Sequence, residues 1–406
     1  MRLAWLAAAM FALASAAAAA PPPYVIDPVF AAPIDRALEN VSQQRDMPED
    51  RRESILARLN LLAWARNDAD FYYHRSNEEI YGPSAHPCPA PPYQVQPTAP
   101  IEPGDLCSGG LGSIAYWGAG VMPPAPSATA NAAALTRLDA ARSHYARAVE
   151  LTPNDLWMRL GYAYTLDQQG RDDEARAQLR AIMRIGQKQL AHRSVQEDQV
   201  TVLREAATQL EHLATSRSDR RALRRMRARL NRVDVIPPPI SPIVVPLVDA
   251  RFDELVDYAS SVGWNFSGQQ VAPPRGWLRD NAAWLVWDPN RRAHITSGFD
   301  MIGERAWGVF WRDGFEALRA LDDNRDGELT GGELGGLALW RDENGDGVSQ
   351  ADEVRALSAY GVQALATSAE STRPGLLTAP NGVQFDDGRM RPLYDWTPGV
   401  GGTPVG

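Results

Sequence analysis

Apolar residues recur every three or four positions through two stretches of the first 232 residues, 49–68 and 131–232. This is the period of an amphipathic α-helix, whose apolar face packs against a core. The clearest run lies between 135 and 151, and its apolar face consists of Leu135, Leu138, Ala141, Tyr145, Ala148 and Val149. The pattern predicts a helical domain over residues 21–234, interrupted at about 69–130 by a Pro-rich insertion without periodicity.

Beyond residue 240 the apolar runs become short and continuous, as they are in strands. The segment AAWLVWD at 282–288 is the clearest of them. Two more runs, 383–385 and 389–396, flank Asp387-Gly388, a dipeptide that favours a hairpin turn. The pattern predicts a small mixed α/β module over residues 249–398, so the fold class of the whole chain is expected to be α+β.

Helices and connectors complete this outline. Aromatic and aliphatic residues from Trp307 to Leu321 predict a helix, and those from Val354 to Tyr360 predict another. Residues 235–248, which contain PPPISPIVVP, predict an extended linker before the module. The last residues, 399–406, are expected to form a flexible tail.

Two stretches of twelve residues, 322–333 and 342–353, both satisfy the pattern D-x-[DN]-x-[DN]-G-x₅-E. Ca²⁺ prefers six to eight oxygen ligands at roughly 2.3–2.6 Å, which positions 1, 3, 5, 7 and 12 of such a loop supply. The glycine at position 6 lets the backbone turn back sharply. The predicted ligands are Asp322, Asn324, Asp326, the Glu328 carbonyl and Glu333 in the first loop, and Asp342, Asn344, Asp346, the Val348 carbonyl and Glu353 in the second. The sequence therefore predicts a pair of EF-hand-type loops with two calcium ions.

Charge supports this interpretation. Between residues 322 and 353 there are ten Asp or Glu and two Arg, so this window carries −8 of the formal net charge of −9. Carboxylates at this density repel one another unless a cation neutralises them. The alternative is a solvated acidic loop rich in turn residues, but two full matches twenty residues apart favour calcium.

Departures from the usual pattern limit what the loops can be. Residues 288–298 look like a third loop, but Arg292 and Ala293 stand at positions 5 and 6, where an acid and a glycine belong. Ser349 occupies position 8 of the second loop, where an aliphatic residue usually makes a β-contact with a partner loop. The eight residues 334–341 leave room for about two helical turns. A calmodulin-like lobe with four full helices is therefore not expected.

The N-terminal segment has the features of a secretory signal peptide. Residues 1–20 contain one basic residue, an apolar run and a small-residue end. An uncleaved membrane anchor is the alternative, but the run is short and alanine-rich. Cys88 and Cys107 are the two cysteines of the chain, and in an oxidising compartment they predict one disulfide. The protein is therefore expected to be periplasmic or secreted, with no membrane span after signal cleavage.

The helical domain resembles a tetratricopeptide repeat. The residues from Trp157 to Tyr164 read W-x₂-L-G-x₂-Y, and a second helix with Asp-Glu-Ala follows Gly170. The resemblance implies an unknown protein or peptide partner, with a plain helical bundle as the alternative. The Arg-rich run 217–232 is expected to be a solvated face or a contact for an anionic partner. Nucleic acid is not an expected partner of an exported protein.

The region 240–396 resembles the EF-hand-type modules of exported bacterial proteins. The shared motifs are LVWDP…ITSG, DGF-A-L, D-x-N-x-DG-x₅-E and LALW. This resemblance covers roughly the last 40% of the chain and implies calcium binding, but no reaction. That family often carries another Asp-Gly-rich calcium segment near 251–257, where this chain reads RFDELVD and lacks the glycines.

No catalytic motif stands out. The six histidines show no metal-ligand spacing, and no nucleophile elbow, P-loop or dinucleotide fingerprint occurs. An enzymatic role is left open, and no catalytic or cofactor-binding residue is assigned. The leading hypothesis is a non-catalytic interaction or scaffold protein of the cell envelope, with calcium mainly structural. The alternative is an exported hydrolase acting on cell-wall or polysaccharide substrates, again with structural calcium.

Overall fold

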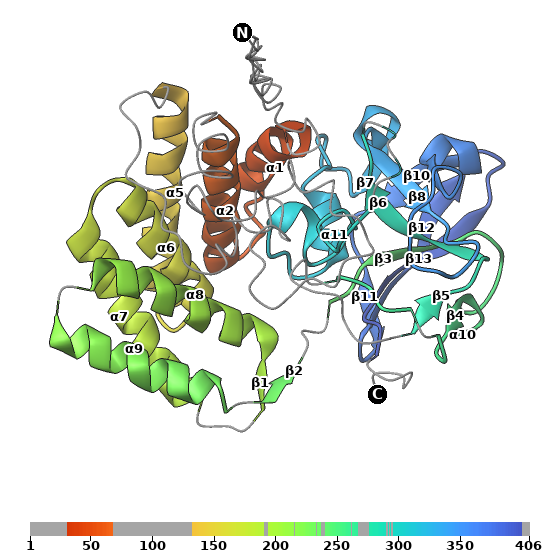
Figure 1. The fold of residues 1–406 in the computed structure, drawn as a ribbon. Helices are drawn as coiled ribbons and strands as arrows, with labels where there is room; N and C mark the ends of the chain where they lie inside the picture. Colours follow the sequence, from red (N-terminus) through yellow and green to blue (C-terminus); the bar gives the residue numbers. More distant parts are fainter. Residues whose placement is uncertain are drawn as a thin grey trace, which may run out of the picture.

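The computed structural model describes residues 31–67, 132–190, 194–232 except 215, 234–236, 240–260, 262–266 and 276–399 except 290, 292 and 294. A helical part and a curled antiparallel sheet part lie side by side, which confirms the α+β class (Figure 1). The predicted signal peptide and the Cys88–Cys107 pair lie outside the described residues. No helix among the described residues is long and apolar enough to cross a membrane.

The helical part follows the predicted periodicity. Its described helices are α1 (Ala31–Gln43), α2 (Glu49–Asn67), α5 (Ala132–Leu151), α6 (Leu156–Gln168), α7 (Asp172–Gln189), α8 (Glu197–Leu213) and α9 (Arg217–Leu230). Helices α2 and α5 pack against each other although the predicted insertion separates them in the sequence. The apolar face predicted for α5 is buried, apart from Leu135, which is 41% exposed. A short parallel pair, β1 (Ser194–Gln196) with β2 (Asp234–Ile236), ends this part.

The packing of α5, α6 and α7 explains the tetratricopeptide-like signature. Asp155 caps α6 by accepting hydrogen bonds from the next helical N–H groups, as N-cap residues do. A Cβ added to Gly161 would lie 2.3 Å from the ring of Tyr145, so the glycine allows α5 and α6 to approach closely. Gly170 takes a φ of 70° in the turn between α6 and α7, a conformation that favours glycine.

The sheet part contains one large sheet with the strand order β7–β10–β12–β13–β3–β6–β8–β9, and β11 pairs with β12 beside this path. All of its pairings are antiparallel, so the predicted mixed α/β module is instead an antiparallel sheet with short helical turns. The strands are β3 (Ile243–Pro246), β6 (Ala282–Trp287), β7 (Glu328–Thr330), β8 (Leu337–Trp340), β9 (Val354–Ala356), β10 (Val362–Ala366), β11 (Glu370–Arg373), β12 (Leu376–Phe385) and β13 (Met390–Trp396). The predicted strand at 282–288 and the predicted closing hairpin are β6 and the pair β12–β13.

Smaller elements pack beside this sheet. They are α10 (Phe252–Leu255), the antiparallel pair β4 (Val256–Asp257) and β5 (Trp277–Leu278), α11 (Gly314–Arg319), and the 3-10 turns η3 (Ala306–Gly308), η4 (Gly331–Leu334) and η5 (Leu357–Tyr360).

The segment expected to be a linker, 235–248, instead supplies a central strand. Strand β3 pairs with β13 on one side and with β6 on the other. Its residues Ile243, Val244 and Val245 are fully buried. Their β-branched side chains suit a strand that is covered on both faces, and the prolines around them do not prevent it. The sheet part therefore begins before residue 249.

Three helical predictions in the sheet part need correction. The expected helix from Trp307 to Leu321 shortens to α11, and Trp307 itself has a φ of 59° in η3. The expected exit helix after the second loop is strand β9 followed by η5, which Gly361 ends with a φ of 71°. The segment 334–341, expected to be helical, contains β8, whose residues are all buried between β6 and β9. Periodicity alone does not distinguish so short an apolar run in a strand from one in a helix.

The two parts share one hydrophobic core. Buried side chains of α1, α2 and α5 belong to the same cluster as those of α11 and the inner face of the sheet. The rings of Trp157 on α6 and Phe310 lie 4.7 Å apart, which adds an aromatic contact across the junction. In Figure 1, α1 and α2 lie directly beside α11, between the other helices and the sheet. The helical part is therefore docked on the sheet.

Candidate metal centre

The two predicted calcium loops, 322–333 and 342–353, share left-handed backbone conformations at two positions. Positions 4 and 6 have positive φ in both: 61° at Arg325 and 93° at Gly327, then 71° at Gly345 and 72° at Gly347. This region is costly for a residue with a Cβ, so the surroundings hold Arg325 in it. The glycine required at position 6 by the sequence pattern occupies the expected conformation in each loop.

Side chains at positions 1, 3 and 5 organise the first loop through its own N–H groups. Asp322 accepts hydrogen bonds from Arg325 N at 2.6 Å through Oδ1 and from Gly327 N at 3.1 Å through Oδ2. Asn324 and Asp326 each accept from the N–H two residues further on, at 2.8 and 3.0 Å. These oxygens come from alternate positions, and all of them accept hydrogen bonds from N–H groups of the same tight turn.

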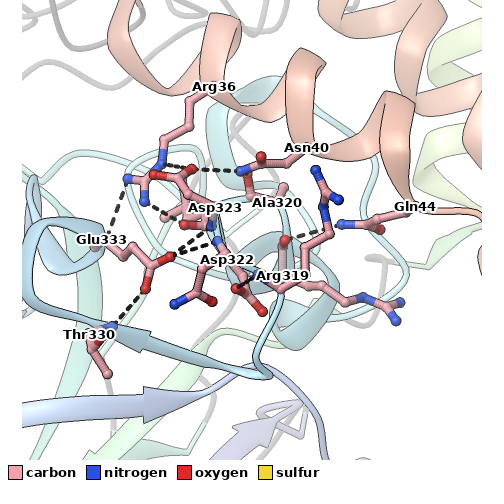
Figure 2. A network of polar contacts seen from close by, with 12 residues as sticks. Arg36, Asn40, Gln44, Arg319, Ala320, Asp322, Asp323, Thr330 and Glu333 are labelled. Atoms are coloured by element: carbon pink, nitrogen blue, oxygen red, sulfur yellow. Dashed lines mark hydrogen bonds and ion pairs between the residues drawn. The ribbon is translucent and has the colours of Figure 1, made fainter.

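The glutamates at position 12 close both loops in the same way. Glu333 Oε2 accepts from the N–H of position 9 at 3.0 Å, and its Oε1 accepts from that of position 2 at 2.8 Å (Figure 2). Glu353 makes the corresponding bonds at 3.3 and 3.0 Å. Each side chain thus reaches back across its loop, from the last position to the first turn.

The second loop is also hydrogen-bonded to two buried indoles. Asp342 accepts from Gly345 N and Gly347 N, both at 2.8 Å, and from Trp277 Nε1 at 2.6 Å. Trp340 Nε1 donates to Glu353 Oε2 at 3.4 Å. The rings of Trp277 and Trp340 lie 5.6 Å apart inside a larger aromatic cluster. The second loop is therefore seated on aromatic side chains that report on their surroundings by fluorescence.

The first and last side chains of each loop are buried carboxylates. Asp322 and Glu333 are 3% and 8% exposed, and Asp342 and Glu353 are 6% and 5% exposed. None of the four forms an ion pair with an Arg, Lys or His of the described ranges. A buried carboxylate is costly unless a positive charge or a metal ion accompanies it. Hydrogen bonds from N–H groups offset part of this cost, and a cation would offset the rest.

Other buried acids of the protein are accounted for differently. Glu316 pairs with Arg51 at 2.7 Å, and Asp219 pairs with Arg180 at 2.7 Å, which lowers the pKa of Asp219 to about 2. Burial raises the pKa of Asp395 to about 7 and that of Glu205 well above its ordinary value, so these two carboxyls favour their neutral forms. The four loop carboxylates have no ion pair of this kind among the described residues, and they stand at the end positions of the two predicted calcium loops, which makes them candidates for metal binding.

The donor chemistry of the loops fits calcium. The described residues contain no ready cluster of three or more Asp, Glu, His or Cys side chains around one point. An EF-hand-type shell does not depend on such a cluster, because it also uses an amide oxygen and a backbone carbonyl. The position 7 side chains, Glu328 and Val348, are both exposed, with Val348 at 44%. All predicted ligands are hard oxygens, which favour calcium over zinc or copper.

The described residues of the degenerate segment 288–298 share two features with the complete loops. Its positions 4 and 6, Arg291 and Ala293, have φ values of 54° and 52°. Asp288 Oδ2 accepts from Ala293 N at 2.9 Å, the same bond that position 1 makes to position 6 in both complete loops. Asn290, Arg292 and His294 lie outside the described residues. These two features persist although the sequence pattern is lost.

The second loop pairs with this third segment. Ser349 Oγ accepts from Ile295 N at 2.9 Å and donates to Ala293 O at 2.9 Å. The serine side chain therefore replaces the β-contact that an aliphatic residue at position 8 usually makes. In the first loop, Leu329 is fully buried and pairs with Leu365 of β10. The two complete loops consequently have different partners and do not pair with each other.

Helix α1 contacts the first loop through residues that the sequence did not single out. Arg36 Nε donates to Asp323 Oδ1 at 2.7 Å, and Asn40 Nδ2 donates to the same oxygen at 2.9 Å (Figure 2). Asp323 stands at position 2 of the loop, between predicted ligands. No local pattern relates residues 36 and 40 to residue 323, so only the tertiary structure could reveal this contact.

Comparison with known proteins supports both halves of the architecture. The model of the SPM domain matches residues 252–392, and that of the tetratricopeptide repeat matches residues 132–197. The helical part carries a tetratricopeptide-like repeat. The chain is also similar to the Iron-regulated protein FrpA of Neisseria meningitidis serogroup C, with 34% identity over 102 residues. The aligned part is 24% of this chain and 9% of that protein, so the chain spans about a tenth of the length of this relative.

Proposed function

We propose that this protein binds two calcium ions in the loops 322–333 and 342–353 and uses them mainly to hold its sheet part together. The observation that carries the proposal is the pair of buried carboxylates in each loop, which lack a described cationic partner. The two loops also share the hydrogen bond from position 6 to position 1 and positive φ at positions 4 and 6, which favours a common ligand. The residues that would hold the ions are Asp322, Asn324, Asp326, Glu328, Glu333, Asp342, Asn344, Asp346, Val348 and Glu353.

The location of the loops in the sheet supports a structural role for calcium. Strand β7 lies within the first loop, and the second loop lies between β8 and β9. Strand β7 pairs with β10, and β8 pairs with β9, in the sheet. Helix α11, which precedes the first loop, has six residues, so no long described helix flanks either loop and could swing outward as in a sensor protein. Calcium bound here would tie neighbouring strands together through their connecting loops.

We further propose that the protein is a non-catalytic interaction or scaffold protein of the cell envelope, periplasmic or secreted. The predicted signal peptide and the predicted Cys88–Cys107 disulfide support export. Tetratricopeptide-like repeats commonly mediate protein–protein interaction, so a protein or peptide is the expected partner of the helical part. The alternative from the sequence is an exported hydrolase that acts on cell-wall or polysaccharide substrates, with structural calcium.

Tryptophan fluorescence tests this proposal at the second loop. We expect the emission of the chelated protein to change when calcium is added, because Trp277 and Trp340 donate to carboxylates that would bind the ion. Glu353→Gln should abolish most of the change, whereas Glu333→Gln, in the loop without these indoles, should preserve it. Asp352→Asn is the matched control, since it removes one negative charge from the second loop at an exposed position that supplies no ligand. An emission spectrum of the wild type that does not respond to millimolar calcium would contradict the proposal.

A further inference from the structure

One face of helix α1 is directed at the entrance of the first loop. Gln44, just after the end of the helix, Asn40 and Arg36 are spaced four residues apart, so they lie one above the other along the helix. Gln44 Nε2 donates to Arg319 O at 3.1 Å, Asn40 Nδ2 donates to Ala320 O at 3.0 Å, and Arg36 Nη2 donates to Leu321 O. Three side chains spaced four residues apart thus cap three consecutive carbonyls. Figure 2 shows Asn40 and Gln44 beside Ala320 and Arg319.

These carbonyls lie where the helix ends, and Arg319 O also accepts from Asp322 N at 3.4 Å. They belong to the end of α11 and the residues after it, where a helix leaves its last C=O groups without intrahelical hydrogen bonds. Helix α11 has six residues and the turn η4 at the end of the loop has four, so neither is a long helix of the kind that flanks an ordinary EF-hand loop. The capping side chains of α1 take the place of the support that a longer entering helix would give.

The same side chains also fix the loop itself. Asn40 and Arg36 both donate to Asp323 Oδ1, and Arg36 Nη1 donates to Glu333 O at 3.4 Å. Contacts from α1 therefore reach positions 2 and 12, on both sides of the predicted ion. In the second loop, the position 2 side chain Glu343 instead pairs with Arg341 beside it, at 2.8 Å. The two loops are therefore supported in different ways.

We propose that α1 positions the first loop for calcium, so that calcium binding at this loop and docking of the N-terminal helices are coupled. The inference rests on the proposed calcium-binding function. A loop held in its binding conformation loses less entropy when the ion binds, so docking of α1 raises the affinity of the site. Coupling of this kind is reciprocal, and calcium at the first loop must therefore stabilise the docking of α1. The second loop binds its ion without this dependence.

Calorimetric titration of the full chain tests the first half of the coupling. In a Glu353→Gln background, only the first loop should bind calcium. Adding Asn40→Ala there removes two hydrogen bonds to the loop region, and we expect calcium affinity to fall about tenfold. In a Glu333→Gln background, the same substitution should leave the affinity of the second loop unchanged. Asn60→Ala is the matched control, because Asn60 is an equally buried asparagine of α2 that donates to Leu56 O within its own helix.

Hydrogen exchange of the full chain tests the second half. Calcium should slow exchange of the amides of Ala31–Gln43 more in Glu353→Gln, which keeps the first site, than in Glu333→Gln, where only the general stabilisation by the second site acts. If the wild type binds calcium, while Asn40→Ala leaves the first site unaffected and α1 exchanges at the same rate with or without the ion, the coupling is disproved and calcium binding stands. If the wild type binds no calcium, the proposed function fails, and the coupling fails with it.

Discussion

Addition of calcium to the chelated full-length protein is expected to raise its melting temperature by roughly 10 °C. A ligand that binds only the folded state stabilises it by RT ln(1 + [L]/Kd), about 2.7 kcal/mol per site at a hundredfold excess over Kd. Two sites therefore contribute about 5 kcal/mol. Circular dichroism of the helices should report the same rise as tryptophan fluorescence, because helices and sheet share one core.

Substitutions in the loops separate calcium ligation from simple relief of charge repulsion. Glu333→Gln and Glu353→Gln should each remove about half of the calcium-dependent rise, and the double variant should remove it all. Asp352→Asn lowers the negative charge by the same amount as either single variant, but it should retain the full rise because Asp352 is exposed and outside the predicted ligand set. An equal loss of the rise in all three single variants would show that net charge, and not ligation, governs the response.

The free energy of unfolding is also expected to depend on pH through Asp395. Asp395 belongs to β13 and is 1% exposed. Its side chain lies against the start of α11, where it accepts hydrogen bonds from Gly314 N and Ser241 and lies near Asp313. Burial raises the pKa of Asp395 from 3.8 to about 7 in the folded state. Between these two values the unfolded chain has lost the proton while the folded protein still holds it. The contribution of this bound proton to the free energy of unfolding is therefore complete below pH 3.8 and is lost as the pH rises to about 7.

Asp395→Asn removes this titration. A difference of about three pKa units corresponds to about 4 kcal/mol. The wild type should therefore lose about that much free energy of unfolding between pH 4 and pH 8 through Asp395, and the variant should not. Denaturant unfolding of both proteins in saturating calcium measures this, because the loop carboxylates then contribute equally to both. Parallel pH profiles of the two proteins would contradict the raised pKa of Asp395.

The features that the sequence predicted well are those encoded over short distances. The helical period and the W-x₂-L-G-x₂-Y signature located α5, α6 and α7, and the Asp387-Gly388 turn located the β12–β13 hairpin. The loop boundaries follow from the fixed spacing of oxygen-bearing residues, and the positive-φ positions coincide with that spacing. Calcium binding itself stays a prediction.

The features that were missed depend on contacts between distant residues. The apolar runs of β3 and β8 are four residues long, which is too short for periodicity to distinguish strand from helix or linker. Their identity as strands is decided by β6, which lies between them in the sheet. The partner of Ser349 was equally hidden, since nothing local in the sequence pairs it with the segment around Ile295.

Calorimetric titration of the chelated full-length protein with calcium tests the central claim most directly. We expect two ions per wild-type chain, one for Glu333→Gln, one for Glu353→Gln and none for the double variant. This result would show that each buried glutamate closes one site and that the segment 288–298 binds no ion of its own. A wild-type titration without heat of binding, or two ions bound by the double variant, would contradict the assignment of the two loops.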